Sequence, residues 1–330
     1  MDELAELKKK FSILRQKARK GDIFQSLGSV ISEELAALSP QKATPVILPD
    51  NDDHALERFQ MYSQQLDTHQ DDGTRPLTIS DEDLRLAVVQ LANPLPEYRD
   101  TGAFFFLSDS IQNELVSDTQ LRWLTMHLVS DEQLFSHILE PENDAVYGRS
   151  FSILVLSLLL FTQRTKRSFM SVDQLDIVID QMALYTSLER DTRGFIGTNG
   201  WAHAFTHMGN ALAEIFMMPQ LMRADKLFLL ASMLAGYREL KKPLMMGETE
   251  RLVEVVMYVA NAHELYVDYI LLTLKLWRKD LVTRHALKAE AQWHQLYNRS
   301  RFFNEIILCG SQNVPKKLYD YVDQTKGYLT

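Results

Sequence analysis

Apolar residues recur at intervals of three and four along most of the chain, which is the spacing of one face of an α-helix. The pattern starts near the N-terminus, where Gly21 interrupts it and separates two amphipathic stretches. We therefore expect residues 1–38 to form a helical hairpin with a basic outer face. The apolar positions that define its two helices are Leu4, Leu7, Phe11 and Leu14, then Phe24, Leu27, Ile31, Leu35 and Leu38.

Residues 39–79 differ in character from the hairpin. They contain four of the ten prolines and the acidic run 50–53, a composition typical of loops. One helix between about His54 and Leu66 fits inside this connector. From Ser80 onward, helical spacing returns and continues through residues 80–330, interrupted by capping residues such as Ser80, Ser117 and the Ser171-x-x-Gln174 pattern. The helices predicted there include one from Ser130 to Pro141 and one from Glu248 to Ala262.

The region from residue 80 predicts an all-α fold, because no strand-like alternation occurs in it. Tyr98, Tyr147, Trp201 and Thr249 each fall near the start of an expected helix. Their spacing of about 50 residues matches repeated helix pairs, which bury their apolar faces only by stacking. We expect an α-α superhelix of stacked pairs, a HEAT-like solenoid, with a closed α/α toroid as the alternative.

One of these expected helices has an unusual polar face. Starting at Trp201, its apolar residues follow helical spacing, while the opposite face carries His203, His207, Asn210 and Glu214 among small residues. Three interpretations stay open for this stripe. The imidazoles bind a divalent metal together with Glu214 or Asp191, they line a ligand pocket without metal, or they are structural and bind neighbouring protein groups.

Four motifs carry a resemblance to a known family. They are residues 189–194 (Glu-Arg-Asp-Thr-Arg-Gly), 200–207 (Gly-Trp-Ala-His-Ala-Phe-Thr-His), 98–100 (Tyr-Arg-Asp) and 149–151 (Arg-Ser-Phe). In this order they resemble an uncharacterised bacterial family, domain-of-unknown-function family 2785, over roughly residues 82–303. The resemblance implies an all-helical fold and no established activity. The chain departs from it at Asn210, where the family is expected to have an acidic residue.

If the helix pairs repeat, several charged residues take comparable positions in successive pairs and converge on the histidines. Arginine offers a fork of donors suited to carboxylate or phosphate, so the pattern predicts a pocket for a small or peptide-like anionic ligand. The alternative is that these residues form ion pairs that pin helix ends together. The predicted ligand-binding residues are Arg99, Asp100, Arg149, Asp191, Arg193, Trp201, His203 and His207.

Composition narrows the functional classes. A net charge of −9 argues against general nucleic-acid binding, and the single cysteine, Cys309, permits no intramolecular disulfide. The longest apolar run, residues 151–161, is shorter than the roughly 20 residues of a membrane span, so we expect a buried helix. No signal peptide, phosphate loop or nucleophile elbow is visible.

Three functional hypotheses remain. The first is a cytoplasmic helical-repeat protein that binds a small molecule or peptide around His203 and His207, with no cofactor. The second is a metal-dependent hydrolase that uses these histidines with Asp191 or Glu214. The third is an interaction scaffold, with homo-oligomers formed through residues 1–38.

Overall fold

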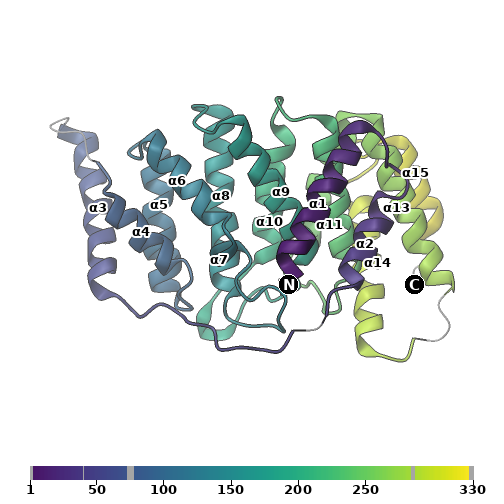
Figure 1. Cartoon of the computed structure of the whole chain (residues 1–330), viewed down its shortest axis with the longest axis horizontal. Coiled ribbons are helices and arrows are strands. Elements are labelled where there is room, and N and C mark those ends of the chain that lie inside the picture. Colours follow the sequence, from purple (N-terminus) through teal and green to yellow (C-terminus); the bar gives the residue numbers. More distant parts are fainter. Residues whose placement is uncertain (1–2, 40, 73–77, 284–286, 327–330) are drawn as a thin grey trace. The chain divides into compact units, whose positions relative to one another are not determined.

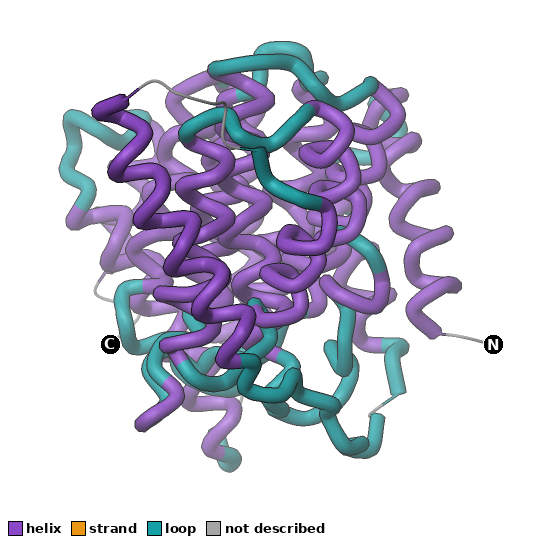
Figure 2. Tube along the Cα trace, turned by 90° about the vertical axis from the view of Figure 1, so that its left-hand side faces the viewer, coloured by secondary structure: helices purple, strands orange, loops and turns teal. Residues whose placement is uncertain are grey.

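The computed structural model describes residues 3–39, 41–72, 78–283 and 287–326, and within them helices are joined by loops (Figure 2). These residues form fifteen α-helices, the π-helix η1 (Glu97–Phe104) and the 3-10 helix η2 (Gly197–Asn199), without a strand. A single bridge pairs Phe195 with Trp201. The predicted all-α class is confirmed.

Contacts divide the chain into two compact units. Unit 1 comprises Met1–Pro40, Ile179–Thr192 and Ile215–Thr330, and unit 2 comprises Gln41–Val178 and Arg193–Glu214. The division falls within two helices, α9 (Val172–Leu188) and α10 (Ala204–Met217). Residues 1–38 therefore group with the C-terminal helices. The predicted division into residues 1–38, 39–79 and 80–330 stays a prediction.

Unit 2 contains a series of helices that pack on their neighbours (Figure 1). The π-helix η1 contacts α3, α4 and α5, while α8 contacts α5, α6 and α7. Ser80 caps α4 and Ser117 caps α6, as their sequences predict. The bounds of these helices are α3 Asp53–Asp72, α4 Asp81–Gln90, α5 Phe105–Gln112, α6 Asp118–Leu128, α7 Asp131–Leu134 and α8 Val146–Thr165.

The helix α8 is long and apolar. By length and composition it is the one candidate membrane span in the described residues, but 83% of its apolar window is buried inside the protein. Burial of this degree is typical of a core helix and agrees with the expectation for residues 151–161. Four of its residues, Tyr147, Arg149, Ser150 and Phe151, contribute to the site described below.

The helix predicted from Ser130 to Pro141 is wrong beyond its first turn, because α7 ends at Leu134. Side chains donate hydrogen bonds to carbonyl groups that backbone amides would bind in a longer helix. The Arg149 guanidinium donates to the Ser136 carbonyl, and the Asn143 amide donates to the His137 carbonyl. His137 itself has a positive φ of 52°, which an α-helix does not accommodate.

Unit 1 is organised around α11. The two N-terminal helices, α1 and α2, both pack on it, and α12 contacts both α13 and α14. A buried ion pair reinforces the contact of α1 with α11, because Arg15 lies 2.8 Å from Asp225. Arg15 also lies 3.0 Å from the more exposed Asp180 of α9. The bounds are α1 Glu3–Lys20, α2 Leu27–Ala36, α11 Arg223–Arg238, α12 Glu248–Ala262, α13 Glu264–Thr283, α14 Glu290–Leu308 and α15 Lys316–Thr325.

Candidate functional site

A short hairpin, residues 194–202, precedes the histidine helix in unit 2. The amide of Ile196 donates to Gly200 O at 2.7 Å, and the amide of Ala202 donates to Gly194 O at 2.8 Å. Gly200 has φ +69°, and a Cβ atom there would lie 2.8 Å from Pro96 Cγ. A glycine is required at this position for both conformation and space.

The helix predicted from Trp201 is wrong at its start, because α10 begins at Ala204. Trp201 is paired in the hairpin, and His203 has a left-handed φ of 52°. The first helical hydrogen bond runs from the His207 amide to the His203 carbonyl, 3.0 Å. His203 therefore precedes the helix, and its ring stacks on Trp201 with 3.9 Å between centroids.

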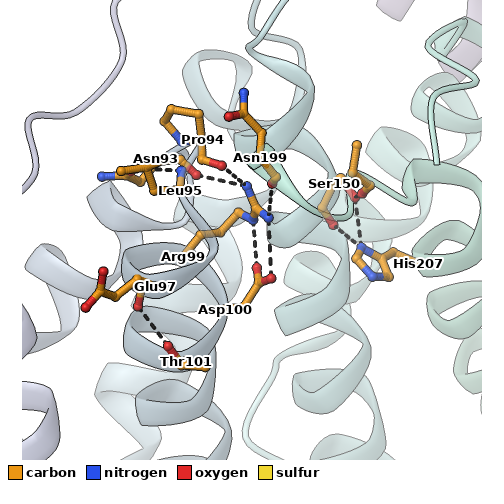
Figure 3. Close-up of polar contacts among 11 residues, drawn as sticks. Asn93, Pro94, Leu95, Glu97, Arg99, Asp100, Thr101, Ser150, Asn199 and His207 are labelled. Carbon is orange, nitrogen blue, oxygen red and sulfur yellow. Dashed lines mark hydrogen bonds and ion pairs between the residues drawn. The ribbon is translucent and has the colours of Figure 1, made fainter. Parts of the chain in front are cut away.

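The imidazole of His207 is buried, with 7% of the residue exposed. Its Nδ1 atom lies 2.8 Å from Ser150 Oγ and 3.1 Å from Ser150 O (Figure 3). The Phe151 ring packs edge-on against it, and the His203 ring centroid lies 6.2 Å away. Burial, opposed by the Ser150 hydrogen bond and assisted by the charges of His203 and Arg99, lowers the pKa of His207 to about 3. The ring is neutral at physiological pH.

Arg99, carried by η1, is fully buried and holds the hairpin in place (Figure 3). Its Nη2 donates to Asn199 O at 2.9 Å, and its Nη1 donates to Asn93 O and Pro94 O. Its Nε donates to Asp100 Oδ1 at 2.7 Å, and Nη2 also reaches Asp100 Oδ2 at 3.4 Å. All five N–H groups of Arg99 thus have acceptors within the protein. This agrees with the alternative that these charged residues hold helix ends together.

The Arg99 guanidinium also lies over two aromatic rings of α8. Its Cζ is 4.6 Å from the Tyr147 ring centroid and 4.7 Å from that of Phe151. Cation–π contacts of this kind stabilise a buried charge that carbonyl groups only partly compensate. Burial raises the pKa of the Asp100 carboxyl, although the neighbouring Arg99 charge opposes the change.

Two further arginines of the predicted set meet at Asn143, in the loop before α8. Arg149 Nη1 lies 3.4 Å from Asn143 Oδ1, and Arg193 Nη2 donates to Asn143 O at 2.7 Å. Arg193 also lies 3.6 Å from Asp144. These contacts fix the loop and the start of α8 to the segment that follows residue 192.

The two acids proposed as metal ligands have contacts of their own. Glu214 forms an ion pair with Arg164 at 2.8 Å. Asp191 belongs to unit 1, where it is buried and its amide donates to Glu189 Oε1. The described residues contain no group of three His, Cys, Asp or Glu side chains able to hold a metal ion.

The sequence that carries these residues is similar to a known protein family. A family model with the description "Protein of unknown function (DUF2785)" matches residues 134–308, just over half of the chain. The chain belongs to this family. No curated protein and no solved structure matches the chain.

The DUF2785 match includes three of the four motifs and both histidines, whereas Arg99 and Asp100 lie N-terminal to it. The sequence prediction missed Ser150 as the hydrogen-bond partner of His207 and Phe151 as its ring contact. A signal for both existed, because they complete the Arg-Ser-Phe motif at residues 149–151. No sequence signal marked the carbonyl of Asn199 as an acceptor for Arg99.

Proposed function

We propose that this protein binds a small molecule or a peptide-like ligand at a surface of unit 2 formed by Trp201, His203 and His207. One observation carries the proposal. Ser150 occupies Nδ1 of the mostly buried His207 ring, and no described residue hydrogen-bonds to its Nε2. Nε2 is not among the buried side-chain atoms without a partner, so it reaches the surface, where a ligand can hydrogen-bond to it.

Exposed aromatic rings beside the imidazoles support the proposal. Phe195 is 53% exposed and Trp201 is 40% exposed. Their rings meet edge to face with 5.0 Å between centroids, and Trp201 in turn stacks on His203. Adjacent large apolar side chains on a surface mark interaction sites. A stacked HEAT-like array or an α/α toroid, either of which fits the all-α class, would present this surface in a concave pocket.

The anionic character of the ligand has less support than the site itself. It was expected from Arg99, Arg149 and Arg193, and each of these side chains binds oxygen atoms of the protein. An arginine whose donors are already engaged contributes little to binding an added carboxylate or phosphate. The proposal therefore depends on His207 and the aromatic rings.

A thermal-shift screen of small molecules and short peptides tests this function. A ligand of the proposed site raises the melting temperature of the wild-type protein and fails to raise that of His207→Gln. The matched control is His54→Gln, which changes a 94% exposed histidine and retains the response. If every stabilising compound acts equally on both variants, the site is not at His207.

A metal-dependent hydrolase using His203 and His207, with Asp191 or Glu214, is the second candidate. The contact between His207 Nδ1 and Ser150 favours it, because metal-binding histidines usually donate their other N–H to a protein oxygen. The ion pair of Glu214 with Arg164 opposes it. Elemental analysis of the purified protein tests this candidate. Stoichiometric metal that disappears in His203→Ala and His207→Ala supports the hydrolase, and a wild-type protein purified without metal contradicts it.

Self-assembly through residues 1–38, the scaffold hypothesis, is a separate proposal. It is supported by Ile13, which is 54% exposed on α1 although the neighbouring apolar positions are buried. Deleting the segment would uncover α11 and confuse the result. The sharper test is Ile13→Glu, which we expect to convert an oligomer to a monomer in light scattering; an unchanged mass contradicts assembly through this face.

A further inference from the structure

We infer that Ser150 fixes His207 in the Nδ1–H tautomer, so that the ligand atom meeting Nε2 is a hydrogen-bond donor. The ligand would then present an N–H or O–H group at this point, and not a carboxylate or phosphate oxygen. This inference rests on the proposed function, and it corrects the ligand chemistry that the arginines suggested.

The assignment follows from the single proton of the Ser150 hydroxyl. Ser150 Oγ hydrogen-bonds to the carbonyl of Ala202, which can only accept, so the serine proton lies in that bond. Only lone pairs of Oγ are left to face His207 Nδ1 at 2.8 Å. The second neighbour of Nδ1, the Ser150 carbonyl at 3.1 Å, also accepts only. Two acceptors face Nδ1, so Nδ1 carries the proton.

The acceptor character of Nε2 is the direct consequence. A neutral imidazole protonated at Nδ1 has a lone pair and no hydrogen at Nε2. The hairpin enforces this state because it places the Ala202 carbonyl against Ser150, and Arg99 holds the hairpin through Asn199. Ser150 is therefore a positioning residue: it acts on the ligand through the tautomer of His207.

The neighbouring groups narrow the ligand class further. Trp201 and Phe195 offer exposed aromatic surface beside the imidazoles, which suits a flat or apolar group. A planar group with an N–H donor, such as an amide, an amidinium or a nitrogen heterocycle, satisfies both features. Benzamide, benzamidine and benzoate share one ring and differ in the polar group, so they are matched probes for this chemistry.

The tautomer is measured directly by nitrogen-15 NMR of the imidazole rings, with His207→Gln to assign the signal. We expect Nδ1–H in the wild-type protein and a mixture of tautomers in Ser150→Ala. Ser152→Ala is the control, because the Ser152 hydroxyl donates to Gly148 O on the same helix and does not contact His207. An Nε2–H tautomer in the wild-type protein overturns the inference, whatever binds.

The ligand class is tested by titrating the three probes into the wild-type protein while following the His207 Nε2 and Trp201 indole signals. We expect benzamide and benzamidine to bind at least tenfold more tightly than benzoate, and Ser150→Ala to lose this preference. Tighter binding of benzoate overturns the donor requirement but keeps the site. If no probe perturbs His207 although the tautomer is Nδ1–H, the proposed function fails while the proton assignment stands.

Discussion

Each unit holds a distant segment in place with a buried arginine, but the partners differ. In unit 1, Arg15 joins α1 to Asp225 of α11 and to Asp180 of α9 through their carboxylates. In unit 2, Arg99 joins η1 to the hairpin through carbonyl oxygens and two aromatic rings, with Asp100 as its one carboxylate. The buried arginine thus binds carboxylates in unit 1. In unit 2 it binds mainly carbonyl dipoles and the faces of aromatic rings.

The difference determines what a substitution leaves behind. A buried carboxylate that is removed leaves arginine charges uncompensated, which is among the costliest changes in a protein interior. Carbonyl oxygens that lose their arginine are uncharged and lose only hydrogen bonds, and Asp100, the one carboxylate partner of Arg99, is partly exposed to solvent. We therefore expect the N-terminal helices of unit 1 to be more sensitive to loss of an acid than the hairpin of unit 2 is to loss of its arginine.

The largest effect is expected for Asp225→Ala. It deprives Arg15 and also Arg19, whose Nε lies 2.7 Å from Asp225 Oδ1, of their shared carboxylate. We expect a loss of about 3–5 kcal/mol in the stability of unit 1, visible as faster hydrogen exchange in α1 and α2. Asp320→Ala, which breaks an exposed pair with Lys316, is the control and should change little. Unchanged exchange in α1 would show that the ion pairs do not hold this helix.

A smaller loss of stability, about 2–3 kcal/mol, is expected in unit 2 for Arg99→Lys. Lysine keeps the charge but lacks the planar fork that reaches Asn93, Pro94 and Asn199 together. Hydrogen exchange should rise in residues 194–202, and the fluorescence of the protein should report a more exposed Trp201. Arg251→Lys, which alters an exposed pair with Glu254, is the matched control. Equal behaviour of both variants would mean that the fork geometry of Arg99 is not required.

Gly200→Ala tests the hairpin of unit 2 at its contact with Pro96. The new methyl group meets Pro96 Cγ at 2.8 Å in a backbone with φ +69°. We expect the stability of the folded protein to fall by about 2 kcal/mol through backbone strain and overpacking together. Gly197→Ala has φ +48° and no atom within 4 Å of the added Cβ, so it isolates the conformational cost. If the two variants lose the same stability, the close approach to Pro96 has no energetic weight.

Much of the fold could be predicted from the sequence, because helix boundaries depend on local signals. The predicted helix Glu248–Ala262 coincides with α12, and Ser80 and Ser117 act as the caps that their positions suggest. The predicted start at Trp201 failed because contacts distant in sequence decide it. The Ala202 carbonyl binds Ser150, and the Asn199 carbonyl binds Arg99, so the chain turns before the helix begins.

The candidate site was predictable to a lesser extent. His207 could be singled out from a polar helix face, whereas the roles of the arginines depend on partners that sequence spacing does not reveal. Three arginines were assigned to an anion, and in the structure each of them donates to protein oxygen atoms, so their role in binding a ligand stays a prediction. Residue type indicates what a side chain can bind. Its tertiary neighbours decide whether that capacity is already used.

The smallest of these effects is a dependence of stability on pH through His207 in unit 2. Burial lowers the pKa of His207 from 6.5 to about 3 in the folded protein, so between these values the unfolded state binds more protons. The stability that the neutral ring contributes is fully present above pH 6.5 and declines as pH falls toward 3, by at most about 1.4 kcal/mol per pH unit. Unfolding of the wild-type protein and His207→Gln should be followed by hydrogen exchange in α10 at pH 7.5 and 5.5. The wild-type protein should lose more protection than the variant at pH 5.5, and parallel behaviour would show that His207 is not held neutral by the fold.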